Sequence, residues 1–291
     1  MKNFSNIVVG LDISNNAQEV LNRAFLVAKR NDSKVTIVHA VDSGFFGNFI
    51  KSENVEKLKD IATKNIKKIL EAVDTQSLNY HIEVQNSKPT VLIMNVAKDK
   101  EASMIVVGAN EKKNFATTVL GSTAHNIAQK SHLPLLIVKN KPNEAYKKIV
   151  AFTDISEVSK KSILFSKEFF NQQNIRCVYA YKLMSDEAFA LRYDEKDQEV
   201  RAEIEKKIKI YEQKQFDDFV KQNNIKDAQL IEDRVGVTNA LANYVDENAN
   251  DLVVLGSSGV NDTGARLYGS TASSLMQSLN CDVLVYISKQ Q

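Results

Sequence analysis

Four of the ten glycines of this 291-residue chain fall within fourteen residues, at positions 256, 259, 264 and 269. They follow the apolar run Leu252–Leu255, and Ser270 and Thr271 come directly after the last of them. Glycine allows a positive φ and lets a ligand come close to the backbone. A strand, a glycine turn and a helix start bring free N–H groups and the positive end of a helix dipole to one place. The pattern therefore predicts an anion site, for the phosphate of a nucleotide.

An aspartate is expected at the same place. Asp154 comes two residues after the apolar run Ile149–Phe152, at the end of the first predicted strand of the second copy. Gly256 directly follows the run Leu252–Leu255, at the end of the fourth. In a doubly wound sheet, ligands bind beyond the carboxyl ends of the strands where the strand order reverses, and the first and fourth strands flank that crevice. Gly256 is expected to turn the chain off the strand. Asp154 offers an acceptor for an adenine amino group or a hydroxyl, or alternatively it caps the next helix.

The same pattern occurs earlier in the chain. Gly121 lies thirteen residues after Gly108, just as Gly269 lies thirteen residues after Gly256. The starts of the halves also match, because Ile-Val-Val-Gly-Leu-Asp-Ile-Ser at 7–14 is echoed by Ile-Val-Ala-Phe-Thr-Asp-Ile-Ser at 149–156. Two copies of one domain explain this better than one large domain.

We therefore expect two domains, at residues 1–141 and 146–291, joined by the polar stretch Lys139–Glu144. About 140 residues are enough for each copy to bury its own core. Both copies indicate strands and helices in the order βαβαβαβαβ, which predicts an α/β fold with a doubly wound parallel sheet. Strand segments such as 135–138 are apolar without alternation, as expected when helices cover both faces.

The spacing of apolar residues locates these elements. In the first copy it predicts strands at 7–10, 35–40, 80–84, 105–107 and 135–138 and helices at 17–29, 55–73, 90–97 (capped by Thr90) and 122–131. In the second copy it predicts strands at 149–152, 177–181, 229–232, 252–255 and 283–287, helices from about 159, 238 and 270, and a long helical region that includes an amphipathic helix at 199–219.

The composition excludes several classes of protein. With 43% hydrophobic and 25% charged residues, the chain is an ordinary globular protein. A net charge of +2 is too small for nucleic acid or an anionic membrane as the main partner. No apolar stretch approaches the roughly 18 residues of a membrane span, and no secretory segment is evident, so we expect a cytoplasmic protein. Two cysteines, Cys177 and Cys281, are too few for a zinc site and are expected to be buried thiols.

The spacing Gly-x2-Gly-x9-Gly-Ser after the fourth strand, with an aspartate after the first, resembles the universal stress protein family over nearly the whole chain. The resemblance implies an adenine nucleotide alpha hydrolase-like fold with strand order 3-2-1-4-5 in each copy. It implies ATP, or ADP or AMP, as the ligand, with Mg²⁺ a candidate companion of the phosphates. The implied contacts are Thr153, Asp154 and Ala180 at the base, Leu255, Gly256 and Gly259 at the ribose and phosphates, and Gly269, Ser270 and Thr271 at the phosphates.

The first copy departs from this motif at one position. Glu111 stands where the second copy has Gly259, although Asp12, Gly108, Gly121 and Ser122 remain. A carboxylate there would repel a polyphosphate by roughly 1 kcal/mol or more when partly desolvated, and the neighbouring residues Lys112 and Lys113 would offset part of this. We therefore predict that the second copy binds nucleotide and that the first binds it weakly or not at all.

No catalytic residue or metal ligand is assigned. All four histidines, at 39, 81, 125 and 132, lie in the first copy, and no Walker A lysine follows the glycines. The first hypothesis is an ATP-binding stress-response regulatory protein, with the nucleotide in the second domain as a conformational or oligomeric switch. The alternatives are a slow ATPase or phosphotransfer enzyme using Asp154 or Ser270, and a nucleotide-free scaffold. In the scaffold the fifth strands pair the two copies, and a further homodimer stays open.

Overall fold

The computed structural model describes residues 4–41, 52–109, 120–142, 144–171, 175–191, 197–257 and 269–287. The first half contains β1 (Asn6–Gly10), α1 (Ala17–Lys29), β2 (Lys34–Val41), α2 (Ser52–Leu70), β3 (Tyr80–Asn86), α3 (Pro89–Asp99), β4 (Met104–Gly108), α4 (Ser122–Lys130) and β5 (Leu135–Val138). The second half contains β6 (Ile149–Thr153), α5 (Glu157–Phe169), β7 (Arg176–Lys182), α6 (Asp186–Ala190), α7 (Gln198–Gln222), β8 (Ala228–Asp233), α8 (Val237–Asn248), β9 (Leu252–Ser257), α9 (Ser270–Ser278) and β10 (Asp282–Ile287).

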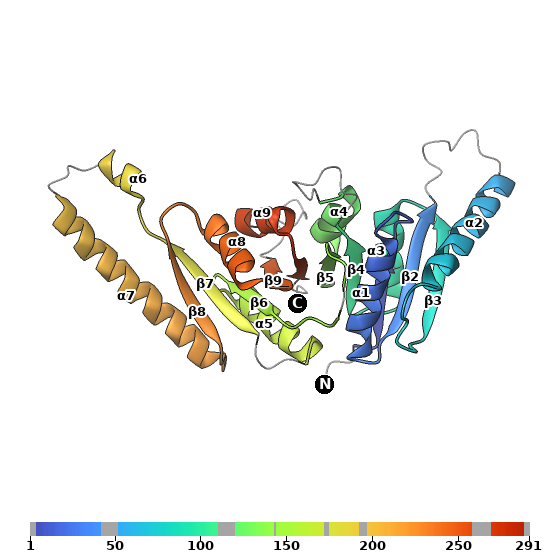
Figure 1. Ribbon diagram of the computed structural model, residues 1–291, viewed down its shortest axis with the longest axis horizontal. Coiled ribbons are helices and arrows are strands. Elements are labelled where there is room, and N and C mark those ends of the chain that lie inside the picture. Colours follow the sequence, from blue (N-terminus) through green and yellow to red (C-terminus); the bar gives the residue numbers. More distant parts are fainter. Residues whose placement is uncertain are drawn as a thin grey trace.

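All of these strands belong to one ten-stranded sheet in the order β3-β2-β1-β4-β5-β10-β9-β6-β7-β8 (Figure 1). Each half therefore has the expected order 3-2-1-4-5, with parallel strands throughout. The halves meet where β5 and β10 pair antiparallel, with Leu136 opposite Leu284. The expected fold class and the pairing of the fifth strands are both confirmed, and the two sheets are continuous with each other.

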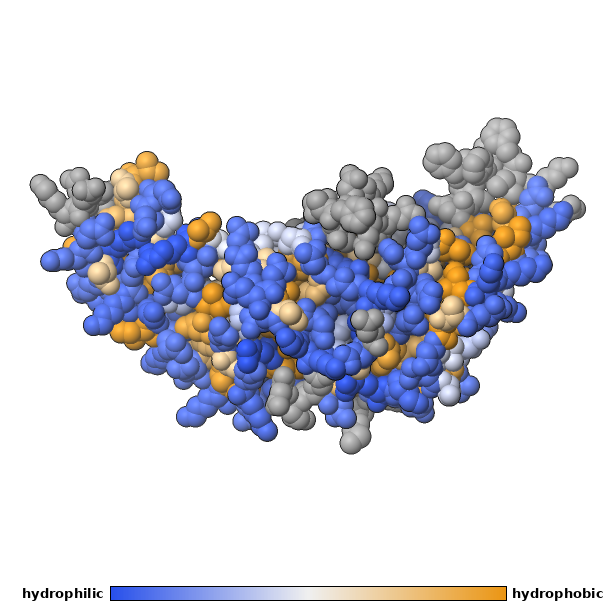
Figure 2. Space-filling model, viewed as in Figure 1, coloured by the Kyte–Doolittle hydropathy of each residue, from blue (hydrophilic) through white to orange (hydrophobic). Residues whose placement is uncertain are grey.

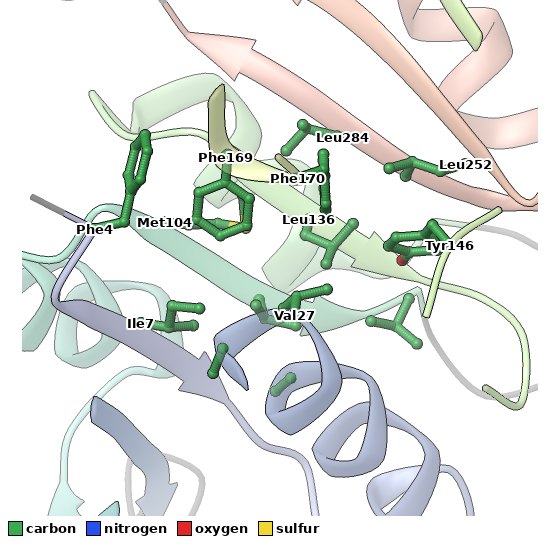
Figure 3. Packing of buried hydrophobic residues seen from close by; sticks show 14 of the residues in the cluster. Phe4, Ile7, Val27, Met104, Leu136, Tyr146, Phe169, Phe170, Leu252 and Leu284 are labelled. Atoms are coloured by element: carbon green, nitrogen blue, oxygen red, sulfur yellow. The ribbon is translucent and has the colours of Figure 1, made fainter. Parts of the chain in front are cut away.

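Helices cover both faces of this sheet, and each face has a core that runs through both halves. One core contains Phe25 of α1, Ile66 of α2, Phe169 of α5 and Phe216 of α7. The other contains residues of α3, α4, α8 and α9. Figure 3 shows the first core at the junction, where Leu136 and Leu284 lie with Phe169 and Phe170. Because neither core stops at the junction, the halves share their hydrophobic interior.

The helices differ in small ways from the sequence prediction. Thr90 does not cap α3, because the helix begins at Pro89 with Lys88 as the N-cap residue. Proline is well suited to the first helical position, since its fixed φ fits the helix and no N–H is needed there. The amphipathic helix expected at 199–219 is α7, but only Phe216 and Phe219 of it are buried. Most of α7 is therefore a solvated helix at the outer end of the sheet (Figure 1).

The visible face in Figure 2 is mainly hydrophilic, with apolar atoms scattered along the outer helices. The large side chains of Val200, Ile204 and Tyr211 on α7 are each more than half exposed. Cys177 and Cys281 are buried as expected, and burial raises the pKa of each thiol to about 12. Among the described residues, no helix combines the length and the apolar character that crossing a membrane requires.

Candidate functional site

A cavity of about 230 Å³ lies at the carboxyl ends of β6, β7 and β9, next to the start of α9. Eight of the nine predicted site residues line it: Thr153, Asp154, Ala180, Leu255, Gly256, Gly269, Ser270 and Thr271. The ninth, Gly259, lies outside the described residues, as does Gly264. The structure thus brings together residues that come from three strands and one helix and that span more than a hundred positions in the sequence.

The described lining divides into an apolar part and a polar part. Phe152, Ala180, Val237, Leu241, Leu255 and Leu275 supply apolar surface that suits a flat ring. The polar part consists of the Asp154 carboxylate and five hydroxyls, those of Thr153, Ser159, Tyr179, Ser270 and Thr271. The described lining contains no lysine, arginine or histidine. An anion bound here would therefore depend on backbone N–H groups and hydroxyls.

The residues around Asp154 form a tight, hydrogen-bonded turn. Thr153 Oγ1 accepts a bond from the Ile155 N–H at 2.9 Å and shares a second bond of 2.7 Å with Ser159 Oγ. Asp154 Oδ1 accepts from the Ser156 N–H at 3.1 Å. Ile155 has φ of 64°, a left-handed conformation that is strained for a β-branched residue. Strain of this kind is retained where the surroundings fix it, commonly at functional sites.

The helix cap that competed with a ligand role for Asp154 is supplied by another residue. Ser156 is the N-cap of α5, and its hydroxyl accepts from the Ser159 N–H at 3.2 Å. Asp154 supports this cap through the Ser156 N–H, and its side chain stays exposed beside the cavity. The carboxylate therefore has a local structural role and remains available for a ligand.

The sequence suggested that Gly256 turns the chain off the strand, but the structure shows no turn at this residue. It lies inside β9, which continues to Ser257, and its φ is not left-handed. Its small size is required for another reason, because a Cβ on Gly256 would meet the backbone of Ser159 at 3.2 Å and of Val158 at 3.3 Å. Glycine at this position lets the start of α5 pack against the strand.

Gly269 differs in this respect. It is the N-cap of α9 with φ −51° and ψ 145°, a conformation open to any residue, and a Cβ there would meet no described atom within 4 Å. Within the described part of the chain, the N–H groups of Gly269, Ser270, Thr271 and Ala272 donate to no acceptor. In the described part of the chain, four donors at the start of α9 are thus unused next to a position where a side chain would meet nothing, and the helix dipole there favours an anion.

Ser257, the last residue of β9, is 2% exposed and its hydroxyl has no hydrogen-bond partner among the described residues, which is uncommon for a buried group. Two polar residues of the described cavity lining, Ser159 and Tyr179, were not predicted from the sequence. Tyr179 lines the cavity and donates its hydroxyl to Glu212 of α7 at 2.8 Å. Burial, with the neighbouring Glu212 carboxylate, raises the pKa of Tyr179 well above its usual value. Neither residue belongs to the glycine pattern, so spacing alone could not identify them.

The first half has a corresponding cavity of about 260 Å³, lined among others by Asp12, Gly108, Gly121 and Ser122. His39 closes one side of it, with Nδ1 2.9 Å from the Leu11 carbonyl oxygen. The two cavities differ at the helix start where an anion would bind. The Gly121 N–H, before α4, donates to the Ala109 carbonyl at 2.7 Å, whereas the corresponding Gly269 N–H, before α9, finds no acceptor in the described segments. Glu111, on which the predicted weakness of this copy depends, lies outside the described residues.

A sequence model of the universal stress protein family matches the chain twice, at residues 3–139 and 145–286. A universal stress protein of Methanocaldococcus jannaschii is 29% identical over 147 residues, which cover 48% of this chain and 85% of the relative. Universal stress protein YxiE of Bacillus subtilis is 26% identical over 147 residues, covering 47% of this chain and 99% of the relative. Each of these relatives thus matches about half of this chain.

A solved structure covers the whole chain. A universal stress protein of Archaeoglobus fulgidus aligns over 100% of both chains with a TM-score of 0.67 at 12% identity, a level that supports the fold alone. The double family match, the strand order of each half and the paired fifth strands agree with one another. The chain therefore belongs to the universal stress protein family, as a tandem member with two copies of the family's fold.

Proposed function

We propose that the second-half cavity binds an adenine nucleotide and that the chain is a regulatory protein of the stress response. The observation that carries this proposal is the start of α9: among the described residues, the Gly269 position is open, four N–H groups there have no acceptor, and Gly269 lines the same cavity as Asp154. A bound phosphate would supply the acceptors that these donors lack.

The rest of the cavity suits the uncharged part of a nucleotide. The apolar surface around Ala180 and Leu255 would cover the faces of the base, and Asp154 would accept a hydrogen bond from the adenine amino group or a sugar hydroxyl. Mg²⁺, if it accompanies the nucleotide, would be held by the phosphates, since Asp154 is the single carboxylate in the described lining.

The proposal includes an asymmetry between the halves. In the first half the Gly121 N–H is already bonded to Ala109, so one donor fewer is free for an anion. Glu111 adds a negative charge at the position of Gly259 in the sequence. Both features favour the second half as the nucleotide site. A nucleotide that binds one conformation of the chain more tightly than another would shift the balance between them, which is the basis of a regulatory role in the cytoplasm.

Isothermal titration calorimetry with ATP, ADP and AMP tests the proposal. We expect one site per wild-type chain, with affinity lost in Asp154→Ala and retained in the matched first-half variant Asp12→Ala. Equal losses in both variants, or two sites of equal affinity, would contradict the asymmetry. No heat from any of the three nucleotides would contradict nucleotide binding itself. Incubation of the loaded protein, followed by separation of ATP and ADP, then tests whether the nucleotide is hydrolysed.

A further inference from the structure

A buried ion pair crosses the junction between the halves. Arg23 of α1 and Asp282 of β10 lie 3.0 Å apart, measured from Nε to Oδ2, and their side chains are 6% and 1% exposed. Arg23 also stacks on the Tyr146 ring, with its guanidinium carbon 3.9 Å from the ring centre. These charges are almost fully removed from water, so each depends on the other for compensation.

The linker between the halves completes this cluster. The Asp282 carboxylate accepts bonds from the N–H groups of Lys139 and Asn140, at 2.8 and 3.1 Å, and from the Tyr146 hydroxyl at 2.6 Å. Arg23 donates to the Glu144 carbonyl at 2.9 Å. The polar stretch read as a linker is thus held against both halves through one arginine and one aspartate.

The repeat allows the counterpart of Asp282 to be found. Val253 pairs with Val283 as Ile105 pairs with Leu135, so Asp282, one residue before Val283, corresponds to Pro134. Pro134 is buried and carries no charge. The second half therefore has a carboxylate at a position where the first half has none.

The counterpart of Arg23 follows from the helix that carries it. The segment 149–156 repeats 7–14 at a distance of 142 positions, and at this distance the buried residues of α5 match those of α1, so Arg23 corresponds to Phe165. The ring contacts agree, because Phe165 packs on Phe4 as Arg23 stacks on Tyr146, the counterpart of Phe4. Phe165 is buried and uncharged. The two halves therefore present different groups at the same position of the junction: arginine with proline in the first half, phenylalanine with aspartate in the second.

This difference determines which halves can pair. If two first halves from separate chains paired through β5, each Arg23 would face Pro134 of the other chain and would be buried without a counter-charge. If two second halves paired through β10, each Asp282 would face Phe165 of the other chain and would also be buried without a counter-charge. Only the pairing of a first half with a second half places Arg23 next to Asp282. Burying one unpaired charge is strongly unfavourable, whereas the complete pair is close to neutral relative to apolar residues.

We propose that Arg23 and Asp282 are the residues that make each β5 edge pair with a β10 edge and prevent pairing of like halves between chains. The partner that fits the junction surface of the first half is a second half, normally that of the same chain. This inference does not depend on nucleotide binding. Its basis is the charge complementarity of the junction and the uncharged counterparts in the repeat.

A disulfide trap distinguishes the two kinds of pairing in the full chain. Leu136 lies opposite Leu284 in the native pair, and Leu284 is the counterpart of Leu136. In a pair of first halves, position 136 would therefore lie opposite itself. Leu136→Cys, in a background with Cys177→Ala and Cys281→Ala, can form a disulfide between chains only when two β5 strands meet. Leu136→Cys with Leu284→Cys in the same background reports the native pairing within a chain.

Each protein is refolded from urea at high concentration, oxidised and run on a non-reducing gel. With Arg23 and Asp282 intact, we expect Leu136→Cys to stay uncrosslinked. With R23M and D282L together, which leave no buried charge to penalise like halves, we expect the fraction of crosslinked dimer to rise at least about tenfold. The control is E203L with K207M, which removes an exposed ion pair of α7 by the same kind of substitution, and it should change nothing.

An unchanged crosslinked fraction in R23M with D282L would overturn the proposal, as would crosslinking of Leu136→Cys with both charges present. If circular dichroism shows that the double variant does not refold, D282N takes its place, because it keeps the side-chain shape and leaves Arg23 without a counter-charge. D282N should then weaken the native pairing, seen as loss of the disulfide within the chain between positions 136 and 284. Retention of that crosslink at the wild-type level would contradict the proposal.

Discussion

Gly256 and Gly269 belong to one sequence motif, yet the structure gives them opposite tolerances for a methyl group. In Gly256→Ala the new Cβ would lie 3.2 Å from the Cα and N of Ser159 and 3.3 Å from the carbonyl carbon of Val158. These are backbone atoms in the first turn of α5, so no side-chain rotation relieves the contact. Overpacking of this kind costs about 1–3 kcal/mol.

In Gly269→Ala the new Cβ meets no described atom within 4 Å, and the backbone conformation is open to alanine. Replacing glycine under these conditions stabilises a protein by about 0.4–1 kcal/mol through the unfolded chain. Gly269 is also the N-cap of α9, where alanine is less favourable than glycine by an amount on the order of 0.5–1 kcal/mol. The two effects nearly cancel, so we expect a change in stability smaller than about 1 kcal/mol.

Urea unfolding followed by circular dichroism measures both free energies without added nucleotide. Gly256→Ala should unfold at a clearly lower urea concentration, and Gly269→Ala should unfold close to the wild type. In a nucleotide titration the order reverses, because Gly269→Ala fills the space assigned to the phosphate and should lose affinity despite its stability. A Gly269→Ala protein as destabilised as Gly256→Ala, or one that binds nucleotide as the wild type does, would contradict the role given to Gly269.

Three further predictions concern residues around the site and the junction. Thr153→Val removes the oxygen that accepts from the Ile155 N–H and bonds to Ser159, so it should lower the free energy of unfolding by about 1–3 kcal/mol, while Thr153→Ser should retain most of it; equal stability of the two variants would contradict this role. Lys139 donates to the carbonyls of Met276 and Leu279 in a buried setting that lowers its pKa to about 8. The unfolded chain keeps this proton to a higher pH, so the stability of the wild type relative to Lys139→Met should be constant below about pH 8 and should rise above it, as urea titrations at several pH values would reveal. Hydrogen bonds from Arg234 and Arg201 lower the pKa of Glu205 to about 2, so the stability of the wild type relative to Glu205→Gln should be present near neutral pH and lost as the pH falls from 4.5 towards about 2; a pH-independent difference would contradict it.

Much of the fold could be predicted from the sequence because the signals were local. The strand at 135–138 is apolar throughout since helices cover both of its faces, and the repeat of the glycine spacing identified the second copy before any contact was known. Element ends shifted by a few residues, as at Lys88 and Pro89, where the capping chemistry of the backbone decides the start. The short helix α6 was not separated from α7, since five residues carry too little periodicity.

The long-range polar contacts could not be predicted in the same way. Lys139 and Asn140 read as linker residues because they are polar, but both donate to the buried Asp282. Asp282 itself gave no signal in the sequence, since its partners Arg23 and Tyr146 are far away along the chain. Contacts of this kind depend on the tertiary fold, which local patterns do not contain.

At the site, eight predicted residues lie in one cavity, whereas Ser159 and Tyr179 come from elements outside the motif. Position 256 requires glycine because the backbone of α5 packs closely against it, and the spacing of glycines in the sequence gives no information on that contact. The glycine pattern thus located the site, while the reasons for its individual residues required the packing around it.

The proposed adenine nucleotide in the second-half cavity can be measured directly. Freshly purified protein is denatured, and the released compounds are separated by chromatography against ATP, ADP and AMP standards, for the wild type and for Gly269→Ala. We expect one adenine nucleotide per wild-type chain and a clear loss in Gly269→Ala. A wild-type protein that releases no adenine nucleotide and takes up none when ATP is added would contradict nucleotide binding at this cavity.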